Sequence, residues 1–333
     1  MEFIGLFDEE KRLEKISLLG DNLEKLNKII DWEIFRNTIT KVFSREKKGN
    51  GRTPYDYILM FKILILQRLF NLSDDQTEYQ ILDRSSFRRF LGVETKIPDA
   101  KTISHFKNEL TKANIIKELF DIFEKKLEDK NIVSHSGSIV DATFIEAPRQ
   151  RNSKEENEAI KNDKIPDNWI KENNVNKIRQ KDVDARWTIK AKVNHYGYKD
   201  HIKVDATSKL ITNYAVTSAN IHDSQKLNEL LDDKDKILYA DSAYVGIELK
   251  NRNMEKQIID KSFRNRSLTE EQKEKNHIKT KIRCRVEHIF GFMTKSMFGK
   301  TIRSIGIKRA EFNIGITNLI YNMFRYNYLS INS

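Results

Sequence analysis

The chain has 333 residues and one cysteine, Cys284, which allows about two domains and excludes an internal disulfide framework or a cysteine-built zinc site. Hydrophobic residues make up 38% and charged residues 33%, and 4 prolines are too few for long disordered linkers. The formal net charge of +11 favours a polyanionic partner, nucleic acid first, over a general Lys-rich composition without function.

Residues 1–133 are predicted to form an all-helical domain. The most apolar stretch, 57–70, is interrupted by Lys62 and Arg68 and is too short to span a bilayer, so it is read as a core helix and no membrane partner is expected. Short connections between helices are the setting of helix-turn-helix DNA-binding units. Helices are expected within 8–45 and at 55–70, 74–83, 85–91, 100–111 and 114–130.

The helix expected at 100–111 is the candidate DNA-reading element of this domain. It leaves His105, Lys107 and Asn108 outside its apolar face, where they can contact DNA. The alternative is that this helix is an ordinary member of a bundle and that the three side chains are solvated.

Residues 134–333 are predicted to form a mixed α/β domain. Segments rich in Ile, Val, Tyr and Thr indicate strands at 138–144, 188–205 and 210–220, followed by alternating helix and strand signals. A polar span at about 149–187 interrupts this pattern after the first strand. A connection of that length inside a compact domain is typical of a functional or mobile insertion.

Three acidic residues have settings that suggest a shared site. Asp141 follows the apolar residues "SIV", and Asp241 follows "KILYA" in the same way. Glu287 lies beside the apolar face of a predicted helix. Carboxylates gathered at one sheet edge repel one another, and two Mg²⁺ or Mn²⁺ ions would relieve that repulsion and support in-line phosphoryl transfer. The alternative for each aspartate alone is a solvated turn residue.

A basic window at 261–285 adjoins Glu287. It holds nine Lys or Arg against three Glu, which is +6 of the total charge. Such a concentration is typical of a nucleic-acid footprint, and Lys281, Arg283 and Arg285 are the candidate phosphate contacts nearest the glutamate.

Several motifs in order resemble one known family. The segments "VDATFIEAPRQ", "GYKDHIKVD", "VTSANIHDS", "YADSAYVG" and "RCRVEHIFGFM" are similar to successive blocks of insertion-sequence DDE transposases of the InsH type, which have an RNase H-like core. Residues from "GRTPYDYILMF" to "IPDAKTISHF" are similar to the helical N-terminal domain of that family. The resemblance covers about residues 40–325.

The resemblance implies specific site residues. Asp141, Asp241 and Glu287 correspond to the D, D and E, and Arg283 to the arginine four positions before the glutamate. Where the family pattern has a lysine this chain has Thr294, so Lys295, about a quarter turn away, is the candidate replacement. Lys199 and Arg149 are further candidate DNA contacts.

The resemblance also implies an activity and partners. We expect a Mg²⁺- or Mn²⁺-dependent enzyme that cuts DNA at terminal inverted repeats and joins the freed 3′-OH to target DNA. It would act as a homodimer or larger assembly on the nucleoid in the cytoplasm. A stand-alone nuclease and a catalytically decayed DNA-binding protein remain the alternatives.

Two tryptophans flank the polar span. In related transposases an aromatic residue on such an insertion can receive a flipped base, and Trp169 and Trp187 are the candidates. For Trp187, beside a predicted strand, packing in the core is expected instead.

Overall fold

The computed structural model describes residues 8–44, 53–93, 96–171, 175–249, 253–262 and 267–331. It divides into two compact units, Met1–Phe123 with Asn322–Ser333, and Glu124–Tyr321. The end of the last helix therefore belongs to the first unit, whereas the predicted boundary at 133/134 assigns the whole helix to the second domain.

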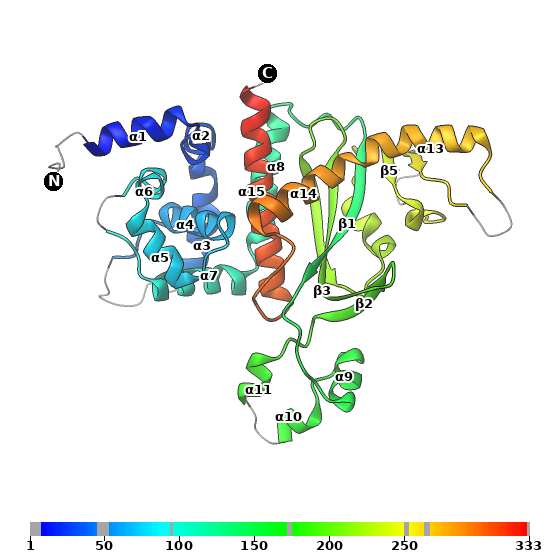
Figure 1. The fold of residues 1–333 in the computed structure, drawn as a ribbon, viewed down its shortest axis with the longest axis horizontal. Coiled ribbons are helices and arrows are strands. Elements are labelled where there is room, and N and C mark those ends of the chain that lie inside the picture. The colour runs from blue at the N-terminus through cyan, green and yellow to red at the C-terminus, as the bar shows by residue number, and fades with distance from the viewer. Residues whose placement is uncertain are drawn as a thin grey trace. The chain divides into compact units, whose positions relative to one another are not determined.

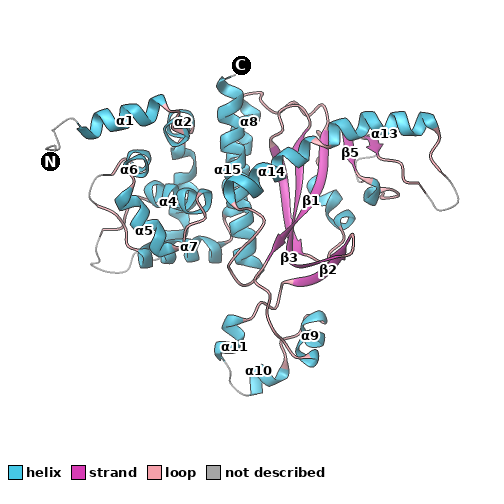
Figure 2. Ribbon diagram, viewed as in Figure 1, coloured by secondary structure: helices cyan, strands magenta, loops and turns pink. Residues whose placement is uncertain are grey.

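The first unit is helical, as expected (Figures 1 and 2). Its helices begin at ordinary capping residues: Asp56 caps the helix Tyr57–Leu69 and Ser73 forms a capping box with Gln76. The described helices are α1 (Asp8–Leu18), α2 (Asn22–Ile29), α3 (Arg36–Phe43), α4 (Tyr57–Leu69), α5 (Asp74–Asp83), α6 (Ser85–Leu91), α7 (Ala100–Ala113) and α8 (Ile116–Asp129), the last of which continues into the second unit.

Helix α7 is the element expected to read DNA. Its apolar face is buried through Ile103, Phe106 and Leu110, which confirms the predicted periodicity. The Lys107 ammonium donates to Asp74 at 2.5 Å and to Gln67 at 3.1 Å, whereas His105 is exposed. Lys107 thus forms bonds within the bundle, and the DNA-reading role of α7 stays a prediction.

The second unit is built on a six-stranded mixed sheet (Figure 2). Strand β3 pairs antiparallel with β1, β2 and β4, while β1, β5 and β6 are parallel. This is the expected RNase H-like mixed sheet, and the α/β class is confirmed. The strands are β1 (Ser138–Glu146), β2 (Arg186–Lys190), β3 (Val193–Asp205), β4 (Ile211–Ser218), β5 (Ile237–Ala240) and β6 (Glu255–Ile258).

Strand β3 changes partners at Gly197. Before this residue it pairs with β2, and from here on it pairs with β1. Gly197 has φ +145, and a Cβ at this position would lie 2.2 Å from the carbonyl oxygen of Ile145. Only glycine permits the two backbones to approach so closely.

The polar span carries more structure than its composition suggests. It forms three short helices, α9 (Lys154–Lys161), α10 (Asp167–Lys171) and α11 (Val175–Gln180), set beyond the sheet (Figure 1). Trp169 is fully buried and donates to the buried Glu156 carboxylate at 2.7 Å, which Lys177 also contacts at 2.6 Å. One aromatic residue and one carboxylate therefore organise a segment that lacks apolar periodicity.

Helices cover the sheet. The helices of this unit that follow the sheet are α13 (Glu270–Arg283), α14 (Arg285–Met297) and most of α15 (Ile307–Ile331). Ala310 and Ile314 of α15 pack in a core with Ile145. Val140 belongs to a second core, together with Leu227 and Leu238. Since neighbouring residues of a strand point to opposite faces, Asp141, Thr143 and Ile145 share one face of β1.

Candidate active site

Asp141 and Asp241 lie side by side at the centre of the sheet. Strands β1 and β5 pair in parallel register through Ser138 with Leu238 and Ile139 with Tyr239. Continuing that register by two residues sets Asp141 beside Asp241. Asp141 lies inside its strand, because β1 continues to Glu146 along β3. Asp241 directly follows the end of β5 and accepts a hydrogen bond from the backbone of Ala243.

Arg283 connects the first aspartate to the glutamate. Its guanidinium donates to Asp141 Oδ2 at 2.8 Å and lies 3.5 Å from Glu287 Oε1. Cys284 is the point where α13 ends and α14 begins, so Arg283 and Glu287 come from successive helices one turn apart. The Asp141 and Arg283 side chains are 17% and 19% exposed, whereas that of Glu287 is 66% exposed.

The Asp141 carboxylate is electrostatically strained. Burial raises its pKa above the ordinary aspartate value, and the nearby charge of Asp241 raises it further. A hydrogen bond from the Ala142 amide and the charge of Arg283 act in the opposite direction. The net effect is a raised pKa, and any additional cation at this position would favour the ionised carboxylate.

The donor set suits a hard divalent cation. Asp141, Asp241 and Glu287 offer only carboxylate oxygens, the ligands that Mg²⁺ prefers. The repulsion between the two aspartates is the observation that a cation would relieve. Within the described ranges, no three His, Cys, Asp or Glu side chains converge closely enough to form a complete metal site. Here Arg283, not a third carboxylate, adjoins Asp141.

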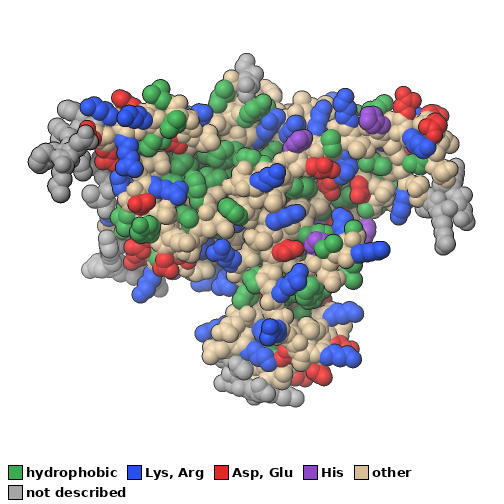
Figure 3. Space-filling view, viewed as in Figure 1, with side chains coloured by type: hydrophobic (Ala, Val, Ile, Leu, Met, Phe, Trp, Pro, Cys, Tyr) green, Lys and Arg blue, Asp and Glu red, His purple; other side chains and the backbone are tan. Residues whose placement is uncertain are grey.

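The other predicted DNA contacts fall into two groups. Arg149, Lys281 and Lys295 have exposed side chains. Arg285 is half-buried and donates to the Ala206 carbonyl. On the visible face, basic side chains are interspersed with acidic ones and form no unbroken patch (Figure 3).

Lys199 differs from the other predicted contacts. It is 7% exposed, and its ammonium donates to Asp223 at 2.8 Å and to the Ile221 carbonyl at 2.6 Å. Asp223 follows His222, which caps the short 3-10 helix Asp223–Lys226. Lys199 therefore anchors this turn to the sheet, and its expected contact with DNA stays a prediction.

The two tryptophans exchange their expected environments. Trp169 is buried in the insertion, so it offers no ring face to a base. Trp187, expected in the core, is 48% exposed, because β2 is the end strand of the described sheet and pairs with β3. Its ring packs against Tyr196, and the Arg149 guanidinium lies 5.5 Å from its centroid.

Sequence reasoning missed Lys300. It lines a pocket with Thr143 and Thr294 on the face of the sheet that carries Asp141. The only signal in the sequence was a lysine after Phe298-Gly299, a helix-ending pair.

The mixed α/β sheet carries Asp141 and Asp241 on adjacent parallel strands at its centre. Residues 133–323 match the family model described as "Transposase DDE domain", and residues 10–109 match "Transposase domain (DUF772)". The chain belongs to the DDE-domain transposase family. The InsH-type resemblance is compatible with these matches.

The chain is also similar to one solved structure and lacks a membrane-spanning element where it is described. The structure is that of a piggyBac transposase in a synaptic complex with hairpin DNA, with 12% sequence identity and a TM-score of 0.43. The similarity covers 91% of this chain and 75% of the other. Among the described helices, none has the length and apolar character needed to cross a membrane.

Proposed function

We propose that this protein is a metal-dependent DNA transposase that cuts the ends of an insertion sequence and joins them to target DNA. The observation that carries the proposal is the strand register that sets Asp141 beside Asp241, with Arg283 between Asp141 and Glu287. The family match supports the same reading.

In this proposal Asp141, Asp241 and Glu287 would hold Mg²⁺ or Mn²⁺, in the two-ion arrangement expected for this chemistry. When bound, the ions supply Lewis-acid chemistry that polarises the scissile phosphodiester for in-line attack. The charge of Arg283 opposes the rise of the Asp141 pKa, and its guanidinium forms ion pairs with both Asp141 and Glu287.

The DNA strand would be held by exposed cations around this centre. Arg149, Lys281 and Lys295 are free to contact phosphates, with Arg283 and Arg285 closer to the acids. We propose that the helical domain, residues 1–133, binds terminal repeats and that residues 134–333 catalyse the reaction. Two element ends must be joined, so we propose a homodimer or larger assembly, acting on the nucleoid in the cytoplasm.

The test is a cleavage assay on DNA that carries the terminal repeats. Asp141→Asn, Asp241→Asn and Glu287→Gln should each abolish cleavage and leave DNA binding largely intact, because phosphate contacts dominate affinity. Asp233→Asn, an exposed acid in the same unit, is the matched control and should cleave like the parent. Metal-dependent cleavage retained by one of the three variants would remove that residue from the site.

The two alternatives predict other outcomes. Cleavage of the repeats without joining to target DNA would favour a stand-alone nuclease. Absence of divalent-ion binding by calorimetry, together with an Asp241→Ala variant that behaves like the parent, would favour a DNA-binding protein without catalysis.

A further inference from the structure

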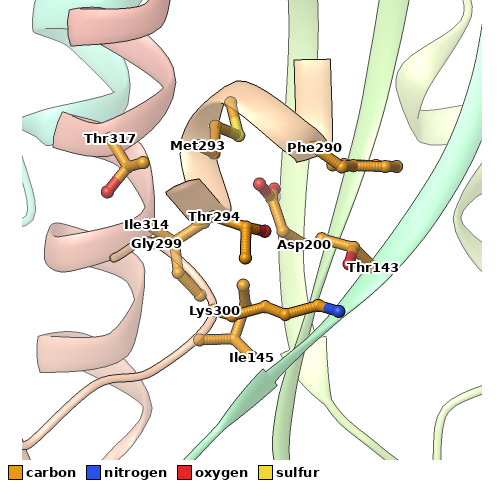
Figure 4. Close-up of a pocket in the computed structure, with 10 residues that line it drawn as sticks. All are labelled: Thr143, Ile145, Asp200, Phe290, Met293, Thr294, Gly299, Lys300, Ile314 and Thr317. Atoms are coloured by element: carbon orange, nitrogen blue, oxygen red, sulfur yellow. The ribbon is translucent and has the colours of Figure 1, made fainter. Parts of the chain in front are cut away.

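A pocket lies beside the acidic centre, on the same face of the sheet. It opens between β1, β3, α14 and α15 (Figure 4). Thr143 lines it from β1, Thr294 from α14, and Lys300 from the segment after α14. Thr143 is two residues beyond Asp141 on one face of the strand, about 7 Å along it.

The backbone of Lys300 is fixed from two sides. Its carbonyl accepts a hydrogen bond from the Glu146 amide at 2.8 Å, and the Ile302 amide donates to the Glu146 carbonyl at 3.0 Å. Before it, Gly299 passes so close to α14 that a Cβ would lie 2.9 Å from the Met293 carbonyl oxygen. The lysine is therefore held against β1, not carried on a free loop.

Three polar groups of this pocket have no partner among the described residues. Figure 4 shows Lys300 extending across the pocket toward Thr143, with the Thr294 hydroxyl above it. Lys300 is exposed, and within the described ranges it has no ion pair. In the same part of the chain, neither threonine hydroxyl has a hydrogen-bond partner.

One acidic residue lines the pocket, but it does not neutralise Lys300. Asp200 is fully buried, and its carboxylate accepts a hydrogen bond from Asn318 at 3.2 Å. Burial raises its pKa to about 7, although the hydrogen bond from Asn318 acts to lower it. An ammonium group and two hydroxyls therefore face the opening. Asp200 is the one acid among the described lining residues, and its carboxylate is bonded to Asn318 on α15.

We propose that Thr143, Thr294 and Lys300 form a binding site for a phosphate of the DNA strand, next to the phosphate that reacts at Asp141. A cation with neighbouring hydroxyl donors is the chemistry that binds a phosphodiester. The inference rests on the proposed function for its ligand. It adds a contact that positions the strand along β1.

The test measures how the affinity of the full chain for a labelled DNA duplex changes with salt. Each phosphate contact contributes about 0.9 to the slope of log affinity against log salt. Lys300→Gln should lower the slope by about that amount. Lys308→Gln removes the same charge from an exposed position on α15 and should leave the slope unchanged. Lys300→Arg should keep the parent slope.

A second variant separates the hydroxyls from the charge. Thr143→Val with Thr294→Val should weaken binding by about threefold to tenfold without changing the slope, because hydroxyls release no counterions. Equal slopes for Lys300→Gln and Lys308→Gln would overturn the inference, as would a parent that binds no DNA. The proposed function fails separately, if the parent binds DNA with the expected slope but the acid variants still cleave.

Discussion

Arg283 is the residue that joins the candidate catalytic groups. Its guanidinium contacts Asp141 and lies within ion-pair distance of Glu287. Because Asp141 is buried beside Asp241, its pKa is raised, and Arg283 is the side chain that opposes this effect most directly.

Arg283→Gln should shift the pH dependence of cleavage. Loss of the positive charge raises the Asp141 pKa further. The proposed function uses the ionised carboxylate, so the acidic limb of the rate profile should move to higher pH. Lys281→Gln, which removes a nearby charge with no contact to Asp141, should leave that limb in place. If the pH profile of cleavage shifted equally in the Arg283→Gln and Lys281→Gln variants, the ion pair between Arg283 and Asp141 would be contradicted.

Asp200 should make the protein less stable as the pH rises. Its folded-state pKa is about 7 against an ordinary value of 3.8, so between these values the folded state holds a proton that the unfolded state has lost. Stability therefore falls from about pH 4 to pH 7. At about 1.4 kcal/mol per pH unit, the loss reaches about 4 kcal/mol.

Asp200→Asn should remove this dependence. Urea unfolding at pH 5 and pH 8 should show the variant gaining over the parent at the higher pH, with Asp233→Asn as the control. A parent and an Asp200→Asn variant with parallel pH dependence would show that Asp200 is ionised in the folded state.

At the scale of elements, the sheet depends on the exchange of partners by β3. The strand leaves β2 and joins β1 at Gly197, where the carbonyl of Tyr196 still bonds the Ala147 amide at 3.0 Å. This junction connects the end of β1, which carries Asp141, to the helical insertion. The close approach of the two backbones at this junction depends on Gly197 having no Cβ.

Gly197→Ala should therefore be strongly destabilising, and Gly291→Ala should not. Alanine at 197 would have to adopt φ +145 and meet the Ile145 carbonyl oxygen at 2.2 Å, so we expect a loss of at least about 1–3 kcal/mol of unfolding free energy. Gly291 lies in α14, where a Cβ would meet no atom within 4 Å, and alanine there should gain about 0.4–1 kcal/mol. Urea unfolding of both variants distinguishes them, and equal stabilities would contradict the close approach.

At the scale of the whole molecule, the net charge of +11 is only partly available to DNA. In the basic window, Lys273 pairs with Glu270 and Lys275 with Glu271 along α13, and Lys279 pairs with Asp260. The first two ion pairs are exposed and contribute little to stability, so a DNA phosphate can replace the carboxylate in each. Unpaired exposed cations near the acidic centre are the stronger candidates for contact.

Affinity for DNA should fall steeply with salt, and three exposed cations should account for much of the slope. A triple variant, Arg149→Gln with Lys281→Gln and Lys295→Gln, should lower the slope by about 2 to 3. Fluorescence anisotropy between low and moderate salt measures it. A triple change at Lys209, Lys236 and Lys308, of equal charge, is the control, and an equal effect from both would mean that only net charge matters.

The sequence by itself determined the helical first part, the mixed α/β second part and the family, because hydrophobic periodicity and ordered motifs are local properties of the chain. It also marked Asp141, Asp241 and Glu287 as one candidate set. Tertiary structure decided their relations: the register of β1 and β5 brings the aspartates together, and Arg283 adjoins Asp141 across 142 residues.

The tertiary structure also decided which candidate side chains are buried and which are exposed. Lys199 and Trp169 look like surface contacts in a polar sequence but are buried with partners, whereas Trp187 and Lys300 face outward. A residue's type and local pattern do not reveal which distant carboxylate or strand will cover it. That depends on contacts between segments far apart in the chain, which only the folded sheet and its helices define.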